Sequence, residues 1–366
     1  MRVGIKVSPL TVLRAGIPNY ILHLLRGMAE VDRDSEFFLY TNRALPFELD
    51  LPPRFRLVRV AYPAPFLQLW YQLGLPLRMK RDGIDIFHDP VYPLPLLLPV
   101  PGVITVHDLS GYENPRVHST RSAVAAKLYP RHIRVARRII ADSGYTASRI
   151  RALFPWAEGK VDVVHLGVSE DFRPVTDREA IGSVRRRYRL PPRFMLFLGT
   201  LEPRKNLERL LSAFEAVGGD PCLVIAGGLG WKYGKLMERI TRHPFSDRIV
   251  MTGFVEVTDL PALLSMAEFL VYPSILEGFG LPILEAMACG TPVITSNTSS
   301  MPEVAGDAAL LIDPLSTDSI ARAMERLAGD EEYRRSLSGQ GLERASLFSW
   351  RTAAEKTLRI YGKALD

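Results

Sequence analysis

The stretch EGFGLPILEAMACGTPV, residues 277–293, places two glutamates around a glycine-rich turn that leads into an apolar helical pattern. Glycines permit such a turn, and Pro282 suits the first turn of the helix because no N–H is needed there. Backbone amides at a helix N-terminus bind phosphate. Glu277 and Glu285 flank this turn and can accept hydrogen bonds from sugar hydroxyls. The alternative is a plain strand–turn–helix with two solvated glutamates.

A pair of cations, Arg204 and Lys205, lies in FLGTLEPRKN, residues 197–206, between an apolar run and a second helical pattern. Positive charge at a helix N-terminus opposes the helix dipole, so the pair predicts a compensating anion. A diphosphate is suitable because a guanidinium binds phosphate oxygens through a fork of N–H donors. The alternative is a solvated turn in which Glu202 and Glu208 are the partners.

Histidines end two of the strand-like runs in the first half of the chain. His107 can act as a general base or a hydrogen-bond donor, and Asp108 can orient it or bind a hydroxyl. A histidine at a strand end is also commonly structural, and the pair His88-Asp89 is a similar case.

Gly16, in the first loop (residues 14–20), permits close approach of a ligand or belongs to an ordinary turn.

Apolar runs alternate with helical patterns twice along the chain, as in proteins with parallel sheets. The predicted strands cover residues 2–7, 36–41, 55–60, 84–89, 102–108 and 138–143, then 194–200, 221–228, 248–254, 269–274, 292–297 and 308–314. The predicted helices cover residues 18–29, 120–138, 207–217, 231–241, 259–266 and 281–289. The sequence therefore predicts an α/β fold of two Rossmann-like domains, with the candidate residues at the carboxyl ends of strands.

A polar, proline-bearing stretch at residues 168–190 has no strand period and predicts a linker. We therefore expect an N-terminal domain over residues 1–170 and a C-terminal domain over residues 171–349. The last segment, residues 350–366, predicts a helix with Trp350, Ala354 and Leu358 on one side. That helix packs on the second domain or crosses back to the first.

The composition excludes disordered chains and small disulfide-bonded scaffolds. The chain has 366 residues, of which 47% are hydrophobic and 23% charged, as in globular proteins of two domains. Cys222 and Cys289 lack metal-binding or CxxC spacing, which indicates a reducing compartment and no structural zinc. The N-terminus lacks the apolar core of a signal peptide, and prolines interrupt the uncharged run at residues 91–106. We expect a cytoplasmic protein without a membrane-spanning helix.

The net charge of +6 is unevenly distributed. Residues 1–173 hold 23 Lys and Arg against 16 Asp and Glu, a balance of +7, and the remaining residues hold 23 against 24, a balance of −1. The basic residues of the first half include two clusters, Lys127, Arg131, Arg134 and Arg138 at helical spacing, and Arg78, Lys80 and Arg81. This face contacts an anionic membrane, or it is only a solvated helix surface. No nucleic-acid recognition motif accompanies it, so we expect no nucleic-acid partner.

Several other kinds of site are not predicted. The sequence has no G-x-S-x-G, no Walker loop and no H-E-x-x-H. The run Gly227–Gly230 lacks the full dinucleotide-binding pattern. Asp32-Arg-Asp34 falls between a helix and a strand, which predicts a surface turn and not a metal site.

The segments TVHDL, ADSGYT, GTLEPRKN, EGFGLPILEAMACGTPVI and GDAALLIDP occur in the order found in retaining glycosyltransferases of family 4, and the chain resembles that family over most of its length. The resemblance implies the GT-B fold, in which two Rossmann-like domains face one another across a cleft. It also implies a nucleotide-sugar donor on the second domain and a glycan or lipid-linked acceptor on the first. The motifs GTLEPRKN and HDL resemble those of bacterial members that build polysaccharides, which are frequently mannosyltransferases. GDP-mannose is therefore the leading candidate for the donor.

The resemblance also assigns roles to individual residues. Glu277 would contact the transferred sugar, Glu285 the ribose, and Lys205 a donor phosphate. The amides that would hold the distal phosphate and sugar are those of Gly278, Phe279, Gly280 and Leu281. His107 would contact the donor sugar, and Gly16 lies in the family's first loop.

One position departs from the family pattern. Many members carry an arginine where this chain has Thr200. In this chain Arg204 would then bind the donor phosphate in place of that arginine. The mechanism implied is metal-independent and uses no cofactor. The alternatives are a non-catalytic nucleotide-sugar-binding protein and another GT-B activity, such as an epimerase or a phosphorylase.

Overall fold

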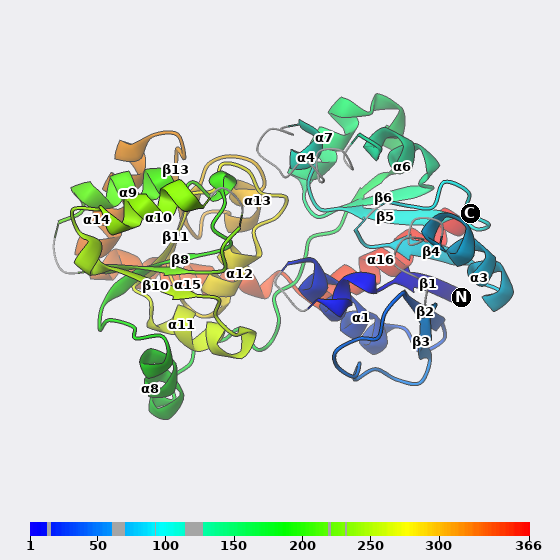
Figure 1. The fold of residues 1–366 in the computed structure, drawn as a ribbon, viewed down its shortest axis with the longest axis horizontal. Helices are drawn as coiled ribbons and strands as arrows, with labels where there is room; N and C mark the ends of the chain where they lie inside the picture. The colour runs from blue at the N-terminus through cyan, green and yellow to red at the C-terminus, as the bar shows by residue number, and fades with distance from the viewer. Residues whose placement is uncertain (13–15, 61–69, 92, 114–126, 219–220, 231–232) are drawn as a thin grey trace. The chain divides into compact units, whose positions relative to one another are not determined.

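The chain forms two compact units, which we describe separately from a computed structural model (Figure 1). Residues 1–12, 16–60, 70–91, 93–113, 127–218, 221–230 and 233–366 are described. Unit 1 comprises Met1–Gly167 and Ser349–Asp366, and unit 2 comprises Val168–Phe348. The C-terminal segment thus belongs to the N-terminal unit.

Unit 1 is built on a seven-stranded sheet in the order β3-β2-β1-β4-β5-β6-β7, with every neighbouring pair parallel. Its strands are β1 (Arg2–Lys6), β2 (Glu36–Thr41), β3 (Phe55–Arg59), β4 (Ile86–Asp89), β5 (Gly102–Val106), β6 (Arg138–Ala141) and β7 (Val161–Val163). The central strands are buried along their whole length, as expected for a parallel sheet covered on both faces.

Two sets of helices cover this sheet. The helices are α1 (Ile17–Val31), α3 (Leu75–Asp82), α4 (Ser110–Glu113), α6 (Tyr129–Val135), α7 (Gly144–Leu153) and α16 (Trp350–Leu365). Residues of α3, α6 and α7 share one hydrophobic core with one face of the sheet. Helices α1 and α16 pack against each other, and α16 also contacts β4, β5 and β6.

Unit 2 is built on a six-stranded parallel sheet in the order β10-β9-β8-β11-β12-β13. Its strands are β8 (Phe194–Leu198), β9 (Cys222–Ala226), β10 (Ile249–Gly253), β11 (Phe269–Tyr272), β12 (Val293–Ser296) and β13 (Leu310–Ile312). Its helices are α8 (Arg178–Arg187), α9 (Leu207–Ala216), α10 (Gly234–Thr241), α11 (Leu260–Met266), α12 (Leu281–Ala288), α13 (Met301–Ala305), α14 (Thr317–Gly329) and α15 (Glu331–Ser346). Helix α9 packs with α10 and α14, whereas α12 packs with α11, α13 and α15.

Each unit is therefore a Rossmann-like α/β layer structure, which confirms the predicted fold class. Three local features differ from what the sequence patterns indicate. The helix expected over residues 120–138 is described only as α6, which ends where Ala136 turns to extended backbone before β6, while residues 120–126 lie outside the described residues. The short strand β7 was not predicted. Residues 168–190 contain α8, whose N-cap is the Asp177 side chain.

Candidate functional site

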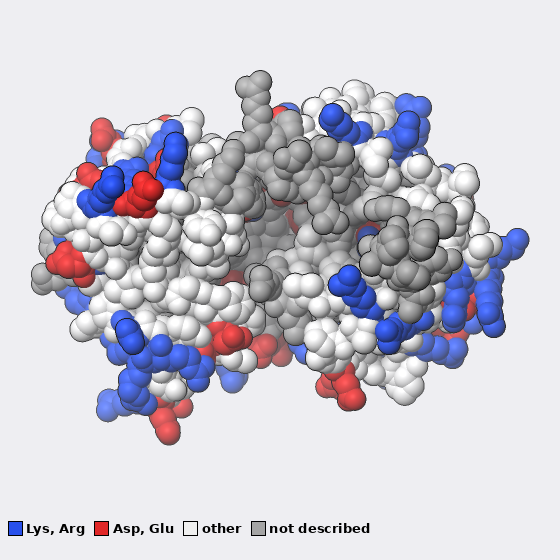
Figure 2. Space-filling model, in the orientation of Figure 1, with Lys and Arg blue, Asp and Glu red and all other residues white. Residues whose placement is uncertain are grey.

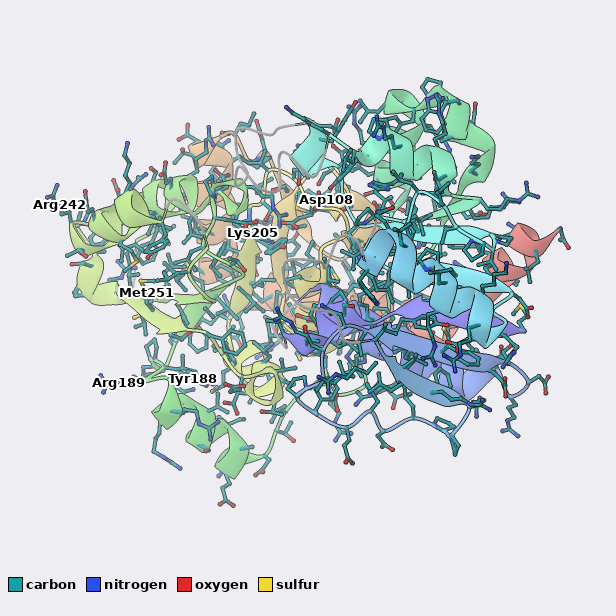
Figure 3. All side chains as sticks on the ribbon, turned by 45° about the vertical axis from the view of Figure 1, so that its right-hand side comes forward. Asp108, Tyr188, Arg189, Lys205, Arg242 and Met251 are labelled. Atoms are coloured by element: carbon teal, nitrogen blue, oxygen red, sulfur yellow. The ribbon has the colours of Figure 1, made fainter. Side chains whose placement is uncertain are left out.

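The two chemistry-bearing segments of unit 2 lie at the carboxyl ends of neighbouring strands. Strand β8 leads into the short helical turn η6 (Pro203–Lys205), and β11, which pairs with β8, leads into the turn before α12. The Ile275 amide donates to the Arg204 carbonyl (2.9 Å) and ties the two loops together. Parallel pairing thus brings residues about 70 positions apart into contact at one sheet edge, where Lys205 is labelled in Figure 3.

Glu277 is the centre of an ion-pair network at this edge. Its Oε1 lies 2.7 Å from Lys205 Nζ, and its Oε2 lies 2.6 Å from Arg204 Nη1. Arg204 Nε also pairs with Glu202 (2.7 Å), and Lys205 Nζ donates to the Tyr272 hydroxyl. We call these five residues the charge network.

The charge network changes one prediction. Two carboxylates, Glu277 and Glu202, balance the two cations inside the chain, so the free protein needs no bound anion to compensate them, and diphosphate binding stays a prediction. Glu202 is a partner as the alternative predicted, whereas Glu208 is exposed and forms no ion pair within the described ranges. An arriving anion therefore has to compete with Glu277 for both cations.

Burial and charge act in opposite directions on these groups. Burial alone would raise the pKa of Glu277, but Lys205 and Arg204 outweigh it and lower that pKa to about 2. Burial lowers the pKa of Lys205, with Glu277 opposing it, and burial raises the pKa of Glu202 against the pull of Arg204. Glu277 is accordingly a carboxylate throughout the neutral range.

The turn before α12 is fixed by hydroxyl groups. Ser300 Oγ contacts the carbonyls of Glu277 (2.9 Å) and Phe279 (2.8 Å), and the Glu277 amide donates to Ser299 Oγ (3.1 Å). Gly280 caps the helix at φ 111°, a backbone conformation that favours glycine. Gly278 and Phe279 are buried in this turn.

The amide N–H groups of Gly280 and Leu281 have no acceptor within the described part of the chain. They lie at the N-terminal end of α12, where a phosphate is electrostatically favoured. Glu285 follows one turn later, partly buried and without a charged partner among the residues that the structure describes, and burial raises its pKa to about 7. Thr200 is exposed directly after Gly199, at the end of β8.

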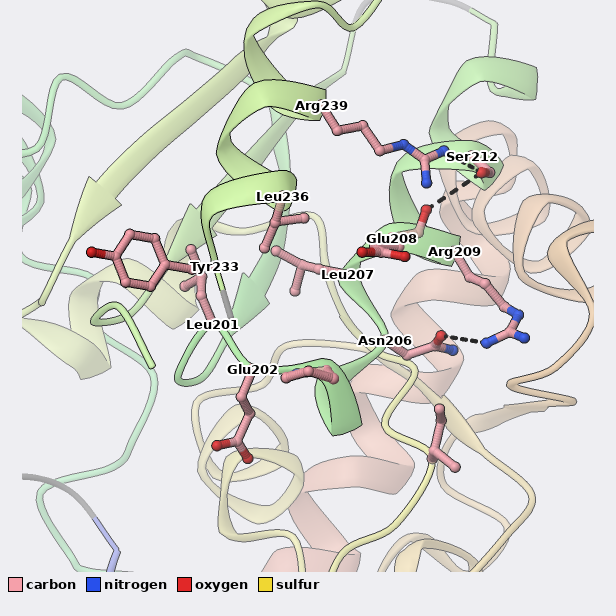
Figure 4. A pocket seen from close by; sticks show the side chains of 12 residues that line it. Leu201, Glu202, Asn206, Leu207, Glu208, Arg209, Ser212, Tyr233, Leu236 and Arg239 are labelled. Atoms are coloured by element: carbon pink, nitrogen blue, oxygen red, sulfur yellow. Dashed lines mark hydrogen bonds between the residues drawn. The ribbon is translucent and has the colours of Figure 1, made fainter. Parts of the chain in front are cut away.

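A cavity of about 330 Å³ opens beside the charge network, between η6, α9 and α10 (Figure 4). Glu202 and Ile275 belong to its wall, so it borders the same loops. Arg209 donates to the Asn206 side chain (3.0 Å), and Arg239 donates to Ser212 Oγ. Asn206 in turn donates to the carbonyls of Pro273 and Pro314, which secures η6 against the neighbouring loops.

His107, which follows β5 in unit 1, has an acceptor at each ring nitrogen. Its Nδ1 lies 2.6 Å from Asp142 Oδ2, and its Nε2 lies 2.8 Å from the Pro90 carbonyl. Burial by itself would lower the pKa of His107. Asp142 and the other acceptors raise this pKa by a larger amount, so the net shift is upward. Because both partners are acceptors, the arrangement favours the imidazolium form and a hydrogen-bond donor over a general base.

Asp108 does not orient His107. Its Oδ1 accepts from the Ser110 amide (2.9 Å) and from Ser110 Oγ (2.6 Å), so it holds the start of α4. The orienting carboxylate is Asp142, which the sequence prediction missed. The only signal in the sequence was that His107 and Asp142 lie near the ends of two predicted strands, residues 102–108 and 138–143; the β5–β6 register, in which Val106 pairs with Ala141, brings them together. Tyr272 and Ser300 were also missed.

The remaining candidates in unit 1 have simpler surroundings. Gly16 is exposed at the N-cap of α1 with φ 81°, and no atom lies within 4 Å of the position of an added Cβ. Arg14, from the same loop, lies outside the described residues. Among the residues that the structure describes, no group of three or more His, Cys, Asp or Glu is arranged to hold a metal ion.

The basic residues of unit 1 do not form one helical stripe. Lys127, Arg131 and Arg134 are exposed, but Arg138 belongs to β6 and donates to the Gly159 carbonyl (3.0 Å). On α3, Lys80 and Arg81 are exposed, whereas Arg78 pairs with Asp82 (2.8 Å). Figure 2 also shows Lys and Arg side chains over α8 of unit 2, whose last turn is Arg185, Arg186 and Arg187. No helix in the described ranges is both long and apolar enough to cross a bilayer.

Comparison with known proteins gives a consistent relationship. The family model described as glycosyl transferases group 1 matches residues 184–344, and the model described as glycosyltransferase family 4 matches residues 14–172. The chain is 32% identical to the O-antigen chain mannosyltransferase B of Escherichia coli, over 99% of both chains. It is 29% identical to the MMP alpha-(1->4)-mannosyltransferase of Mycolicibacterium hassiacum, over 94% of both.

A solved structure supports the fold. The sucrose-phosphate synthase of Thermosynechococcus elongatus superposes with a TM-score of 0.80 at 21% identity, over 99% of this chain and 98% of that one. The two Rossmann-like units are therefore those of the GT-B fold, as predicted.

Proposed function

The chain belongs to glycosyltransferase family 4, and from this premise we propose that it transfers mannose from GDP-mannose to a hydroxyl of a glycan or lipid-linked acceptor, with retention of configuration. Two relatives that align over nearly the whole chain are named mannosyltransferases, which supports the choice of sugar. The observation that carries the proposal is the position of Glu277, which binds Lys205 and Arg204 beside the N-terminus of α12.

In this proposal the charge network reorganises when the donor binds. The diphosphate takes Lys205 and Arg204 as partners, together with the amides of Gly280 and Leu281, and these groups stabilise the negative charge that develops on the leaving group. Glu277 then exchanges its ion pairs for hydrogen bonds from the sugar hydroxyls. Glu285 accepts hydrogen bonds from the ribose, and Thr200 borders the phosphates without supplying a charge.

The sugar passes through an oxocarbenium-like state as its bond to the diphosphate breaks. The acceptor hydroxyl attacks from the face that the diphosphate leaves, and its proton passes to the departing phosphate oxygen, which gives retention. Both ring nitrogens of His107 face acceptors, so in this proposal His107 donates to the sugar only when its Nε2–H exchanges the Pro90 carbonyl for a sugar oxygen, while Asp142 keeps Nδ1. We assign Asp108 to holding α4 and not to the reaction.

A screen of nucleotide sugars tests the proposed donor. GDP-, UDP-, ADP- and dTDP-sugars are compared by the rise in melting temperature, because a ligand that binds only the folded state stabilises it. GDP-mannose is expected to give the largest rise and to release GDP faster when acceptor is present. Stabilisation without release of nucleotide, with or without acceptor, would leave only a binding protein.

We also propose that the reaction needs no metal ion, since Arg204 and Lys205 supply the positive charge that a cation would otherwise provide. Transfer measured in EDTA is expected to match transfer in Mg²⁺. Loss of activity in EDTA that added Mg²⁺ restores would contradict this.

We further propose that the protein is cytoplasmic and that unit 1 binds an anionic membrane which carries the lipid-linked acceptor. Exposed Lys127, Arg131 and Arg134 lie close in the sequence to Leu128, which is 45% exposed, and the Arg134 guanidinium lies 5.1 Å from the ring centre of exposed Trp156. Basic and apolar side chains together suit a lipid headgroup region. Binding to vesicles containing phosphatidylglycerol is expected to weaken as salt rises, and no binding at low salt would leave a solvated surface.

A further inference from the structure

The pair His88-Asp89 takes no part in the proposed reaction, yet His88 lies in a continuous chain of buried polar groups. The Tyr361 hydroxyl of α16 and His88 Nδ1 are 2.7 Å apart. His88 Nε2 and Thr105 Oγ1 are 2.9 Å apart, and Thr105 Oγ1 and the Tyr20 hydroxyl are also 2.9 Å apart. We call these four residues the buried chain.

The buried chain is enclosed in unit 1. Tyr361, His88 and Thr105 are completely buried, and Tyr20 is 3% exposed. Each side chain comes from a different element, namely α16, β4, β5 and α1. A buried polar group without a partner is costly, so each member constrains the position of the next one.

Tyr20, the last residue of the buried chain, contacts His107. Thr105 and His107 are two residues apart at the end of β5, so they lie on the same face of the sheet. The Tyr20 ring packs edge-on against the His107 imidazole, with 4.8 Å between ring centres. Because the Tyr20 hydroxyl is bound to Thr105, the placement of this ring depends on the hydroxyl orientation of Thr105.

His88 connects α16 to that orientation. Burial, with His107 adding to it, lowers the pKa of His88 to about 3, so its ring is neutral and carries a single N–H. If this N–H faces Tyr361, then His88 Nε2 is an acceptor for Thr105. If it faces Thr105, then Nδ1 is an acceptor for Tyr361. The donor or acceptor role of the Tyr361 hydroxyl is therefore coupled, through the single N–H of His88, to the direction of the Thr105 hydrogen bond.

We propose that Tyr361 of the C-terminal helix is a positioning residue for His107, acting through the buried chain. This inference rests on the proposed function only for its effect on the rate, since the coupling itself is a property of the folded protein. The position of the imidazole, held on one side by Asp142 and Pro90, is set on the other side by the Tyr20 ring.

The test follows the His107 ring directly. ¹⁵N-labelled histidine reports the ring signals of His107, which are assigned by their loss in His107→Gln. Tyr361→Phe removes one hydroxyl and keeps the aromatic ring. It is expected to shift the His107 signals and to lower kcat for GDP-mannose transfer by roughly three- to tenfold, as for one lost hydrogen bond, with the KM for the donor unchanged.

Three further variants separate positioning from general destabilisation. Tyr188→Phe is the control, because it too removes a tyrosine hydroxyl that bonds a side chain, here Asp259 (2.8 Å), but in unit 2, where Tyr188 is labelled in Figure 3. It is expected to change neither the signals nor kcat. Thr105→Val is expected to reproduce Tyr361→Phe, whereas Thr105→Ser, which keeps the hydroxyl, retains wild-type behaviour.

The outcomes are distinguishable. Unshifted His107 signals in Tyr361→Phe would overturn the proposal, whatever the rate does. Shifted signals with a reduced kcat support it fully. Shifted signals with an unchanged kcat support the positioning and remove His107 from the proposed reaction, a result that an active His107→Gln enzyme would corroborate.

Discussion

Glu277 is the residue on which most of the candidate chemistry depends. It pairs with the two cations that a diphosphate would need, and with Glu202 it leaves the site without a net charge. These ion pairs fix the positions of the Arg204 and Lys205 side chains in the absence of a ligand. In the proposed reaction, donor binding exchanges one set of ion pairs for another and avoids leaving unpaired charge in a buried site.

Lys205→Ala tests the role of the cation. It removes one contact that stabilises the leaving group and is expected to lower kcat/KM by on the order of 100-fold. Steady-state kinetics with GDP-mannose measure the effect. Lys235→Ala, at an exposed position of α10, is the matched control and should leave kcat/KM unchanged. Equal rates for the two variants would exclude Lys205 from the mechanism.

Glu285 makes the stability of the protein depend on pH. Its pKa rises from 4.5 to about 7 on folding, so between these values the folded chain keeps a proton that the unfolded chain releases. Stability is therefore lost as pH rises through this window. Glu285→Gln is expected to raise the melting temperature at pH 8, to leave it unchanged near pH 4, and to reduce the rise caused by donor.

Glu238→Gln is the control for this measurement, since Glu238 is exposed on α10. It should give the same difference from the wild type at both pH values. If the melting temperature of Glu285→Gln at pH 8 is lower than that of the wild type, the ionised carboxylate does not destabilise the folded state and the prediction is wrong.

At the scale of elements, strand register decides which loops meet. The β8–β11 pairing joins η6 to the turn before α12, and the β5–β6 pairing joins His107 to Asp142. A hydroxyl from the neighbouring loop then fixes the turn before α12. Ser300, at the N-cap of α13, contacts the carbonyls of Glu277 and Phe279 through its Oγ.

Ser300→Ala tests that turn. The variant loses the hydroxyl that contacts the Glu277 and Phe279 carbonyls, and the free energy of unfolding is expected to fall by about 1–2 kcal/mol. The KM for donor should rise several-fold because the turn loses its anchor. Ser338→Ala is the control, since Ser338 Oγ donates to the Gly290 carbonyl (2.6 Å) away from the turn. It should reduce stability without changing KM.

At the scale of the whole molecule, the end of the chain completes the unit in which the chain begins. One face of α16 is buried, through Trp350, Ala353, Ala354, Thr357, Ile360, Tyr361 and Ala364. The contact with α1 is close at Gly27, where an added Cβ would lie 2.5 Å from the Trp350 carbonyl oxygen. Unit 1 therefore lacks part of its core until the last residues of the chain are in place.

Gly27→Ala tests this closeness. In a helix interior the change from Gly to Ala normally stabilises by up to about 1 kcal/mol. At Gly27 the backbone of α16 occupies the space, so we expect destabilisation of about 1–3 kcal/mol, measured by urea unfolding. Gly339→Ala, in α15 with nothing within 4 Å of the added Cβ, should show the normal gain. A gain at both positions would contradict the close packing.

The sequence by itself determined the strands, the fold class and most candidate residues, because those depend on short-range patterns. Parallel strands buried on both faces are continuous apolar runs, and the glycines and charges that follow them are adjacent in the chain. A short strand such as β7, only three residues long, carries too weak a pattern to be predicted.

Only the tertiary structure decided which partners the charged groups have. Glu277 pairs with Arg204 and Lys205 from about 70 residues away, and Asp142 in place of Asp108 orients His107. It also decided that residues 350–366 complete the first unit, since the buried face of α16 would suit any apolar surface. Such pairings depend on which strands lie side by side and which helix reaches which sheet, and local sequence does not encode these distances.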